Sequence, residues 1–528
     1  MSPTNHFVFI SSNGVSHLRL LLQLALNLLD LHPSLIITFI ISDRIAEKYE
    51  SEYGLQPTSL VNRVQARFRP EIISTAFTGS KQQEEASGSK VLHSMDANKR
   101  YNQGLADAVQ GLISGTRQGR WATMPCGFAV DMFLCDFVHS KVNEVVAKLG
   151  LSHIPTWHVN PGSAVGHHRL FASHEHGGLM EKVQERYDGN VAMGMEDALA
   201  TETAIRWDED RLLSFPDLPP MYGYELGPQV ASQSFPGAAR IFGALLGGAR
   251  NVDGFICSSV PELQQASMQW LEKSMGMPII GVGPQLNEIV WSGAEQERVG
   301  KDAATESRML SFLDKAQKEY GSHSAAWISL GSWVWPTRRP EVMLNVIESL
   351  LIIEPPLPFI FKLPAQDSGI PDALVKKVEE TRRGLFTHWA PQVKILQHEA
   401  IGMFLTHCGI GSIMETIMAG VPIIALPFTA DQPELAAHYC VMHGCGVQLY
   451  QHSSLYEKRT FANGIVADST LESMQQELKE TWEQMRGEEG KRYRKNCKAI
   501  AEIIRQSADT GGSKENMLRF SDHFTDKS

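Results

Sequence analysis

The chain has 528 residues, of which 43% are hydrophobic and 20% are charged, and its formal net charge is -11. This length exceeds what a single hydrophobic core usually supports, so we expect two domains of a soluble globular protein. The negative charge and the lack of a basic tract argue against nucleic-acid binding.

The first predicted elements are a short apolar strand and a helix. Residues 6–11 form the strand, residues 12–16 form a loop, and His17 lies in the first turn of a helix whose apolar residues continue to Leu28. Partial positive charge at a helix start disfavours the imidazolium, so we expect a neutral His17 that can accept a proton.

Nothing near the N-terminus predicts export or a membrane span. The Leu-rich stretch 18–42 is interrupted by polar residues and is better explained by a helix and a strand than by a transmembrane segment. The N-terminus lacks the basic region and cleavage site of a secretory signal. Seven scattered cysteines without a C-x-x-C pair favour a reducing compartment over a disulfide framework or zinc site. We therefore predict a cytoplasmic protein.

Two long inserts, at about 76–125 and 160–250, separate the predicted strands of the first half. Residues 215–222 and 235–246 are apolar, as a pocket for a hydrophobic alcohol or phenol would require, but ordinary loop packing explains them equally well. Histidines around Glu175 could be considered metal ligands, but their spacing does not support a site and we predict no metal. These histidines are His167, His168, His174 and His176.

The second half repeats the alternation of strands and helices from Ala325 to about Tyr450, and helices fill 470–506. A charged segment precedes it and Gly511-Gly512-Ser513 follows it, which predicts a linker and a final short helix. The expected division is a first domain at 1–284, a linker at 285–308, a second domain at 309–506 and a tail at 507–528.

The most informative stretch runs from Trp389 to Gln432. It contains a predicted strand (403–406), a glycine-rich turn (407–412) and then a helix. Unpaired N–H groups and partial positive charge at a helix start suit a phosphate. A second predicted strand is followed by Asp431 and Gln432, and in a parallel sheet both loops open at the same edge.

This stretch resembles the donor-site motif of the family 1 UDP-sugar glycosyltransferases, of the plant and fungal secondary-product type. The matching positions are Trp389, Gln392, His398, His407, Gly409, Ser412, Glu415, Pro427, Asp431 and Gln432. Ile410-Gly411 departs from the Trp-Asn of the plant pattern, and its effect on donor choice stays open. The resemblance implies an α/β protein of the GT-B fold, in which two doubly wound Rossmann-like domains face each other across a cleft and the C-terminal tail returns to the first domain.

The resemblance also implies donor-binding roles. Trp389, with Ala390 beside it, would stack on uracil, while Gln392 and Glu415 would bind the ribose hydroxyls. The diphosphate would be held by Ser332, His407, Gly409, Gly411 and Ser412, and the sugar by Asp431, Gln432 and His158. Without the motif, Ser412 and Glu415 fit equally well as a helix capping box.

For catalysis, the resemblance implies that His17 acts as general base and that an Asp following a later apolar strand orients it. We assign Asp131, within the predicted strand 128–133, to this role; Asp136 is the second choice because it lies beyond the expected strand end. The implied reaction is inverting sugar transfer with UDP-sugar as co-substrate, without a metal or another cofactor.

The donor is expected to be UDP-glucose, because Gln432 commonly accompanies glucose in the family, while glucuronic acid, galactose and N-acetylglucosamine stay open. The expected acceptor is a small hydrophobic hydroxyl compound: a phenol, flavonoid, sterol, terpenoid or hydroxy fatty acid. The sequence indicates neither which acceptor nor the oligomeric state.

Two other classes of protein share part of this pattern. In a nicotinamide-dependent oxidoreductase, Gly409, Gly411 and Asp431 would imitate the dinucleotide fingerprint, but Met414 replaces its third glycine and Trp389 would have no role. A non-catalytic sugar-nucleotide binder would be favoured by loss of the catalytic residues, which are present.

Overall fold

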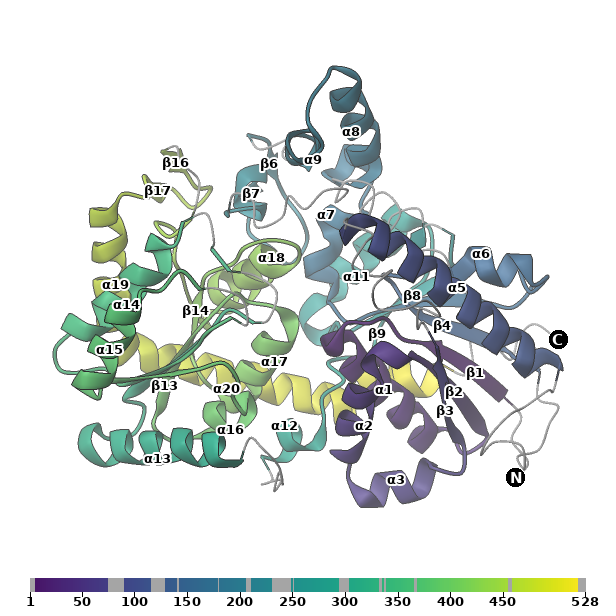
Figure 1. The fold of residues 1–528 in the computed structure, drawn as a ribbon, viewed down its shortest axis with the longest axis horizontal. Coiled ribbons are helices and arrows are strands. Elements are labelled where there is room, and N and C mark those ends of the chain that lie inside the picture. Colours follow the sequence, from purple (N-terminus) through teal and green to yellow (C-terminus); the bar gives the residue numbers. More distant parts are fainter. Residues whose placement is uncertain are drawn as a thin grey trace, which may run out of the picture.

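Two parallel β-sheets flanked by helices form the protein (Figure 1). The computed structural model describes residues 5–74, 90–114, 129–139, 142–178, 180–205, 210–229, 248–249, 251–293, 303–331, 335–336, 339–364, 368–453 and 458–520. The first sheet has the strand order β3-β2-β1-β4-β5-β8-β9, and the second has the order β12-β11-β10-β13-β14-β15. The prediction of two doubly wound α/β units is confirmed.

The first sheet is buried on both faces because its strands are continuous apolar runs. Phe7 and Phe9 of β1 pack with the leucines of α1, while Val8 and Ile10 pack on the opposite face with α5 and α6. Its strands are β1 (Asn5–Ile10), β2 (Leu35–Ser42), β3 (Phe68–Ile73), β4 (Met132–Asp136), β5 (Thr156–Asn160), β8 (Gly254–Cys257) and β9 (Ile279–Gly281). Its main helices are α1 (Val15–Leu31), α2 (Ala46–Gly54), α3 (Thr58–Val64), α5 (Lys90–Ser114), α6 (Val142–Lys148) and α11 (Pro261–Met275).

Between β5 and β8 the chain forms short helices that reach above both sheets in Figure 1. These elements are η3 (Ala164–His167), α7 (His168–Phe171), η4 (His174–His176), η5 (Met180–Lys182), α8 (Val183–Ala192), α9 (Asp197–Ile205), β6 (Leu212–Leu213), β7 (Met221–Tyr222) and η6 (Gly223–Leu226). The segment that contains η3 begins at the carboxyl end of β5, which places it beside the ends of the central strands.

The second sheet is also covered by helices on both faces. Met403 and Leu405 of β13 face α14 and α19, while Phe404 faces α13 and α16. Its strands are β10 (Ala325–Ser329), β11 (Phe359–Lys362), β12 (Gly384–Thr387), β13 (Ile401–Thr406), β14 (Ile423–Ala425) and β15 (Gly446–Gln448). The helices are α12 (Glu288–Ser292), α13 (Ala303–Tyr320), α14 (Glu341–Ile352), α15 (Asp372–Thr381), α16 (Gln392–Gln397), α17 (Ile410–Ala419), α18 (Gln432–Ala436), η7 (Ala437–Met442), α19 (Leu471–Arg486), α20 (Glu488–Asp509) and α21 (Gly512–Arg519), with a small hairpin of β16 (Arg459–Thr460) and β17 (Val466–Ala467).

The segment expected as a linker contains structure of its own. α12 packs against α17, and Val290 belongs to the same core cluster as Ile413 and Ile417. The start of this segment is therefore fixed to the second sheet.

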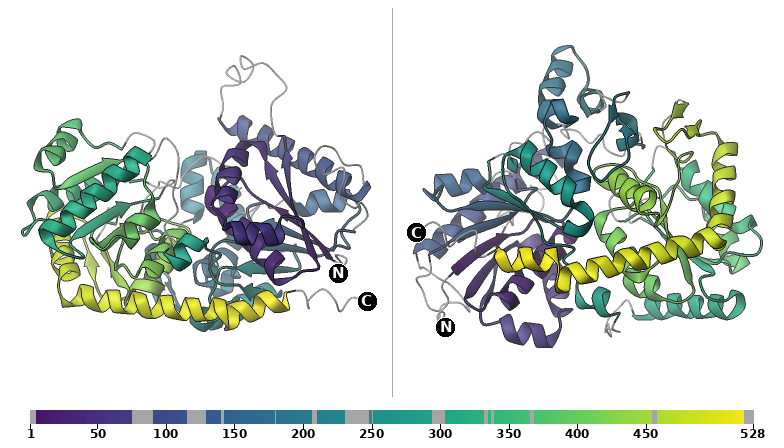
Figure 2. Two further views of the ribbon diagram at one scale, coloured as in Figure 1. Left: turned by 90° about the horizontal axis from the view of Figure 1, so that it is seen from below. Right: turned by 180° about the vertical axis from the view of Figure 1, so that it is seen from behind.

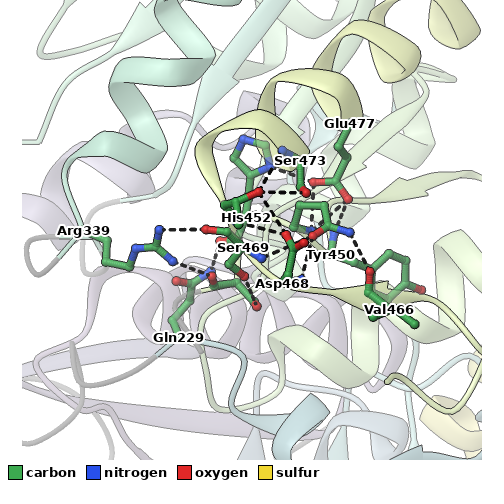
Figure 3. Close-up of polar contacts among 12 residues, drawn as sticks. Gln229, Arg339, Tyr450, His452, Val466, Asp468, Ser469, Ser473 and Glu477 are labelled. Atoms are coloured by element: carbon green, nitrogen blue, oxygen red, sulfur yellow. Dashed lines mark hydrogen bonds and ion pairs between the residues drawn. The ribbon is translucent and has the colours of Figure 1, made fainter. Parts of the chain in front are cut away.

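The chain after β15 is anchored by one carboxylate of α19 (Figure 3). Glu477 accepts hydrogen bonds from the backbone N–H groups of Tyr450 (2.7 Å) and Gln451 (3.0 Å) and from His452 Nδ1 (2.7 Å). Gln229, from the insert of the first half, donates to the carbonyl oxygen of His452 at 2.9 Å. This cluster therefore connects the first half of the chain to the second.

The C-terminal helices cross from the second sheet to the first. Figure 2 shows α20 running beneath both, and α21 then packs against α1 and β9. Phe520 makes edge-to-face contacts with Phe7 (6.0 Å between ring centroids) and Trp157 (5.9 Å). Within the described part of the chain, no helix combines the length and apolar character needed to cross a membrane.

Phe520→Ala should lower the free energy of unfolding by about 3–5 kcal/mol, because the phenyl ring is 1% exposed within the core of the first sheet. Urea denaturation measures this. Leu518→Ala, at a position 46% exposed on the same helix end, is the matched control and should change the value by less than about 0.5 kcal/mol. Equal effects of the two substitutions would show that the tail does not contribute to the first core.

Candidate functional site

A histidine and an aspartate meet at the carboxyl edge of the first sheet. His17 lies in the first turn of α1, and its Nδ1 is 3.0 and 2.9 Å from the two carboxylate oxygens of Asp136, the last residue of β4. Asp136 is fully buried and also accepts a hydrogen bond from the N–H of Val138 at 3.2 Å. Because β1 and β4 are parallel neighbours, the loop after one strand meets the end of the other. Donation from Nδ1–H to the carboxylate leaves Nε2 as the basic nitrogen of His17.

The assignment of Asp131 as partner of His17 is wrong. Asp131 precedes β4 and accepts a hydrogen bond from the N–H of His6 at 2.7 Å, at the opposite, amino edge of the sheet. The strand was predicted at 128–133, but β4 begins at Met132 and ends at Asp136. Asp136, the second choice from the sequence, occupies the position beside the histidine.

The two groups shift each other's pKa in opposite directions. Burial by itself lowers the pKa of His17, but the charge and hydrogen bond of Asp136, together with the charge of Asp431, raise it above the ordinary value of 6.5. Burial raises the pKa of Asp136, but the charge and hydrogen bond of His17 lower it below 3.8. The expectation that the helix start would keep His17 neutral is therefore incorrect, because the two carboxylates raise the pKa of its imidazole.

The pair has a defined pH window of stability. The raised pKa of His17 means that its stabilising contribution is present below pH 6.5 and is lost as the pH rises through the folded-state pKa. The lowered pKa of Asp136 gives a contribution that is present above pH 3.8 and is lost as the pH falls through the folded-state pKa.

Across from this pair, the second sheet presents a polar network at α16 and α17. Gln392 Nε2 donates to Glu415 Oε2 at 2.7 Å and to Ser412 Oγ at 3.3 Å, while Trp327 Nε1 donates to Gln392 Oε1 at 3.3 Å. The N-cap of α17 is Gly409, without a side-chain hydrogen bond, so Ser412 and Glu415 do not form a capping box. Glu415 is directed towards Gln392 instead, and burial raises its pKa.

The start of α17 is open for an anion. Gly411 is exposed, and nothing lies within 4 Å of the position that a Cβ would occupy there. His407 directly follows β13, and its ring lies against the backbones of Gly331 and Gly409, where a Cβ would come within 2.7 Å of the imidazole. Burial, with the nearby charge of Lys362, lowers the pKa of His407 to about 4, so the ring is neutral at pH 7. Ser332 lies outside the described residues.

Trp389 follows β12 and is half-buried. Its backbone N–H bonds to Thr387 Oγ1 at 3.3 Å, and its side chain packs against the core cluster beneath α16, as does Ala390. Part of the indole therefore remains exposed next to the Gln392–Glu415 network.

Asp431 is the N-cap residue of α18, and Gln432 is the first residue of that helix. Gln432 Oε1 accepts hydrogen bonds from the N–H groups of Phe428 (3.0 Å) and Thr429 (3.3 Å), which leaves its Nε2 as the group available to a ligand. Burial raises the pKa of Asp431 to about 6, although the charge of His17 opposes the shift. A Cβ on Gly166 of η3 would lie 2.5 Å from Asp431 Cβ, so the first and second halves of the chain are in close contact here.

His158 is not placed for contact with a donor sugar. It lies in the middle of β5, is 0% exposed and packs edge-on against Phe255 at 5.4 Å. Its side chain therefore offers no surface to a ligand.

Two further expectations concerned apolar segments that could line an acceptor pocket and histidines that could bind a metal. Phe215, Leu218 and Met221 are buried in a core cluster that joins both halves, and residues 235–246 lie outside the described part of the chain. Across the described residues, no three His, Cys, Asp or Glu side chains are grouped as metal ligands.

Sequence reasoning missed two residues of the site. The ring of Phe137 stacks on His17 at 5.7 Å with an interplanar angle of 16°. Lys362, the last residue of β11, donates to the carbonyl oxygen of Gly331 at 3.4 Å, beside His407. A correct placement of the end of β4 would have revealed Phe137. The signal for Lys362 was its position at the end of a predicted strand.

Several known proteins are similar in sequence to this chain. A family model described as UDP-glucoronosyl and UDP-glucosyl transferase matches residues 309–463. UDP-glycosyltransferase eriJ of Hericium erinaceus is 29% identical over 54% of this chain and 56% of its own length, and UDP-glycosyltransferase 92A1 of Arabidopsis thaliana is 26% identical over 51% of each. Residues 309–463 of the chain are therefore similar to the UDP-glycosyltransferase family. The aligned region spans about half the length of these curated relatives.

Solved UDP-glycosyltransferase structures share the GT-B fold over nearly the whole chain. The crystal structure of a transferase from Siraitia grosvenorii in complex with UDP has a TM-score of 0.66 at 19% identity and covers 98% of this chain and 99% of its own. The structure of a Medicago truncatula enzyme complexed with UDP-glucose also has a TM-score of 0.66, at 20% identity, and covers 99% and 98%. These similarities favour the glycosyltransferase interpretation over the nicotinamide-dependent alternative.

Asp136→Asn should lower the pKa of His17 below 6.5, because burial then acts without the charge of the carboxylate. An NMR titration of the His17 imidazole measures the shift directly. Asp131→Asn is the matched control and should leave the titration as in the wild type. A shift in the control but not in Asp136→Asn would overturn the corrected assignment.

Proposed function

We propose that the chain is an inverting UDP-sugar-dependent glycosyltransferase that transfers glucose from UDP-glucose to a hydroxyl of a small hydrophobic acceptor. The observation that carries this proposal is the position of the His17–Asp136 pair, whose electrostatic environment includes Asp431 of the second sheet. We infer that His17, at the edge of the first sheet, acts as a base that faces the donor-binding residues of the second half. The acceptor class comprises phenols, flavonoids, sterols, terpenoids and hydroxy fatty acids.

In the proposed mechanism, His17 Nε2 takes the proton from the acceptor hydroxyl as general base. Asp136 holds Nδ1–H, fixes the ring orientation and stabilises the imidazolium that forms. The acceptor oxygen attacks the anomeric carbon from the face opposite to UDP, which inverts the configuration.

Charge that develops on the leaving diphosphate would be stabilised by the start of α17, by the neutral ring of His407 and by the ammonium group of Lys362. The lowered pKa of His407 supports a role as hydrogen-bond donor and not as a cation. The positive charge of Lys362 acts on that ring.

For the donor, we propose that the exposed part of Trp389 stacks on uracil and that Gln392 and Glu415 bind the ribose. Asp431 and the free Nε2 of Gln432 would bind the sugar hydroxyls. The Medicago truncatula structure, which is complexed with UDP-glucose, supports glucose as the first donor to test. UDP-glucuronic acid, UDP-galactose and UDP-N-acetylglucosamine are the alternatives.

His17→Ala should reduce sugar transfer by at least about 100-fold, because the acceptor loses its general base. The measurement is acceptor-dependent UDP release from UDP-glucose with a panel of phenols, flavonoids, sterols and hydroxy fatty acids. UDP affinity, measured by calorimetry, should stay near the wild-type value. His153→Ala, at an exposed position, is the control. Full transfer activity in His17→Ala would remove His17 from the mechanism.

Trp389→Ala should weaken UDP binding about 5- to 150-fold, the range expected for loss of one base–aromatic stack worth about 1–3 kcal/mol. Titration calorimetry with UDP measures this, and Trp389→Phe should retain most of the affinity because it keeps an aromatic face. Unchanged affinity in Trp389→Ala would place the uracil elsewhere.

A further inference from the structure

Two side chains from different elements converge on the backbone carbonyl of Ser11, which directly follows β1. Tyr101 of α5 donates its hydroxyl to this oxygen at 3.0 Å, and His139, in the turn after β4, donates its Nε2–H at 3.1 Å. The two donor rings are stacked on each other, with 4.6 Å between their centroids and an interplanar angle of 10°. Ser11 is 0% exposed and Tyr101 is 4% exposed, so the bonds are shielded from competing water.

Ser11 begins the loop that leads from β1 to His17. Its N–H donates to the carbonyl of Ile40 on β2 at 3.1 Å, so both backbone groups of Ser11 are held in place. The loop ends where the carbonyl of Gly14 accepts a hydrogen bond from the N–H of Leu18 at 2.9 Å, which starts α1. His17 lies in this first turn, so the position of Ser11 is passed to the imidazole along a short segment with hydrogen bonds at both ends.

His139 belongs to the turn that carries Asp136. The N–H of His139 donates to the carbonyl of Asp136 at 2.9 Å, and its ring reaches back from this turn to Ser11 beside the neighbouring strand. The hydrogen bond from His139 Nε2 therefore joins the loop of His17 to the turn of Asp136. The separation of these two segments sets the contact of 2.9 Å between His17 Nδ1 and the Asp136 carboxylate.

Both donors keep their protons at pH 7. Burial, together with the charges of Cys135 and Asp136, raises the pKa of the Tyr101 hydroxyl well above its ordinary range. Burial lowers the pKa of His139 below 6.5, although the charge of Asp136 and the carbonyl of Ser11 oppose the shift, so the ring is neutral. A neutral imidazole has one N–H, and in His139 it is the Nε2–H that Ser11 accepts.

We propose that Tyr101 and His139 are positioning residues that set the distance and orientation of His17 relative to Asp136 through the carbonyl of Ser11. This proposal rests on the proposed function, because it assigns the residues that prepare the general base. It also gives a role to α5, which lies in the long insert of the first half and supplies Tyr101 to this edge of the sheet.

The test is the pKa of the His17 imidazole, measured by NMR titration of the histidine-labelled full chain without substrate. The signal of His17 is the one that is absent from His17→Ala. Tyr101→Phe removes the hydroxyl and keeps the stacked ring, so the loop should loosen and the contact with Asp136, which raises the pKa, should weaken. The pKa of His17 should therefore fall to a value between those of the wild type and Asp136→Asn.

The charges around the imidazole stay the same in Tyr101→Phe. The titratable groups that face His17 are Asp136, His139, His167 and Asp431. Because the substitution changes none of them, a fall in the pKa of His17 reports its position relative to Asp136.

His139→Phe gives a second measurement in which the charge effect and the positioning effect have opposite signs. It removes the N–H to Ser11 but keeps a planar ring against Tyr101. Loss of the positive charge of a protonated His139 would raise the pKa of His17, whereas a looser loop lowers it. A fall is expected. His139→Gln restores an N–H donor and should return the pKa of His17 towards the wild-type value.

Tyr53→Phe is the matched control. It makes the same chemical change on α2, where the ring stacks on Phe68 at 5.6 Å, and the pKa of His17 should equal that of the wild type. An unchanged pKa of His17 in both Tyr101→Phe and His139→Phe would overturn the positioning role, whatever happens to sugar transfer.

Transfer kinetics separate this proposal from the proposed function. In Tyr101→Phe, kcat/KM for the acceptor should fall about tenfold while UDP affinity stays as in the wild type, because a misplaced base slows the reaction without touching the nucleotide. If the pKa of His17 shifts as expected while the wild type glycosylates no acceptor, the positioning role stands and the proposed reaction fails. If the wild type is active and the pKa does not shift in the variants, the reaction stands and the positioning role is overturned.

Discussion

The hydrogen bond between His17 and Asp136 is the interaction on which the site depends. It joins the loop after β1 to the end of β4, and it exists because these strands are parallel neighbours that end at one edge. A fully buried carboxylate is unfavourable by itself, and the imidazole together with the N–H of Val138 compensates it. The same bond fixes the tautomer of His17, so one contact both stabilises the first sheet and defines which nitrogen can act as a base.

The second constraint is the close contact between η3, which follows β5 of the first sheet, and the start of α18 in the second half. Gly166 lies against Asp431 so closely that a Cβ would overlap with the aspartate side chain. This contact brings a carboxylate of the donor motif within electrostatic reach of His17, although more than four hundred residues separate them in the chain. The site is therefore a property of the two halves together, and neither sheet contains it alone.

Much of this arrangement could be predicted from the sequence, because the local signals were strong. Alternating apolar runs and helices gave the two doubly wound units, and the glycine-rich turn before α17 located the open helix start. The partner of His17 could not be assigned, since Asp131 and Asp136 bracket the same apolar run and only strand pairing decides which end meets β1. Glu415 was equally ambiguous: its sequence position fits a cap, and only the approach of α16 directs it to Gln392.

The chain passes between the two sheets twice, and both passages occur at one place. Asn516 Nδ2 of α21 donates to the carbonyl of Gly281 at 2.7 Å, and Ser513 lies against Gly283, where the chain leaves β9. Because both covalent connections are gathered there, the arrangement of the two halves elsewhere is set by non-covalent contacts, such as the core cluster that contains Phe215 of the first half and Ile413 of the second.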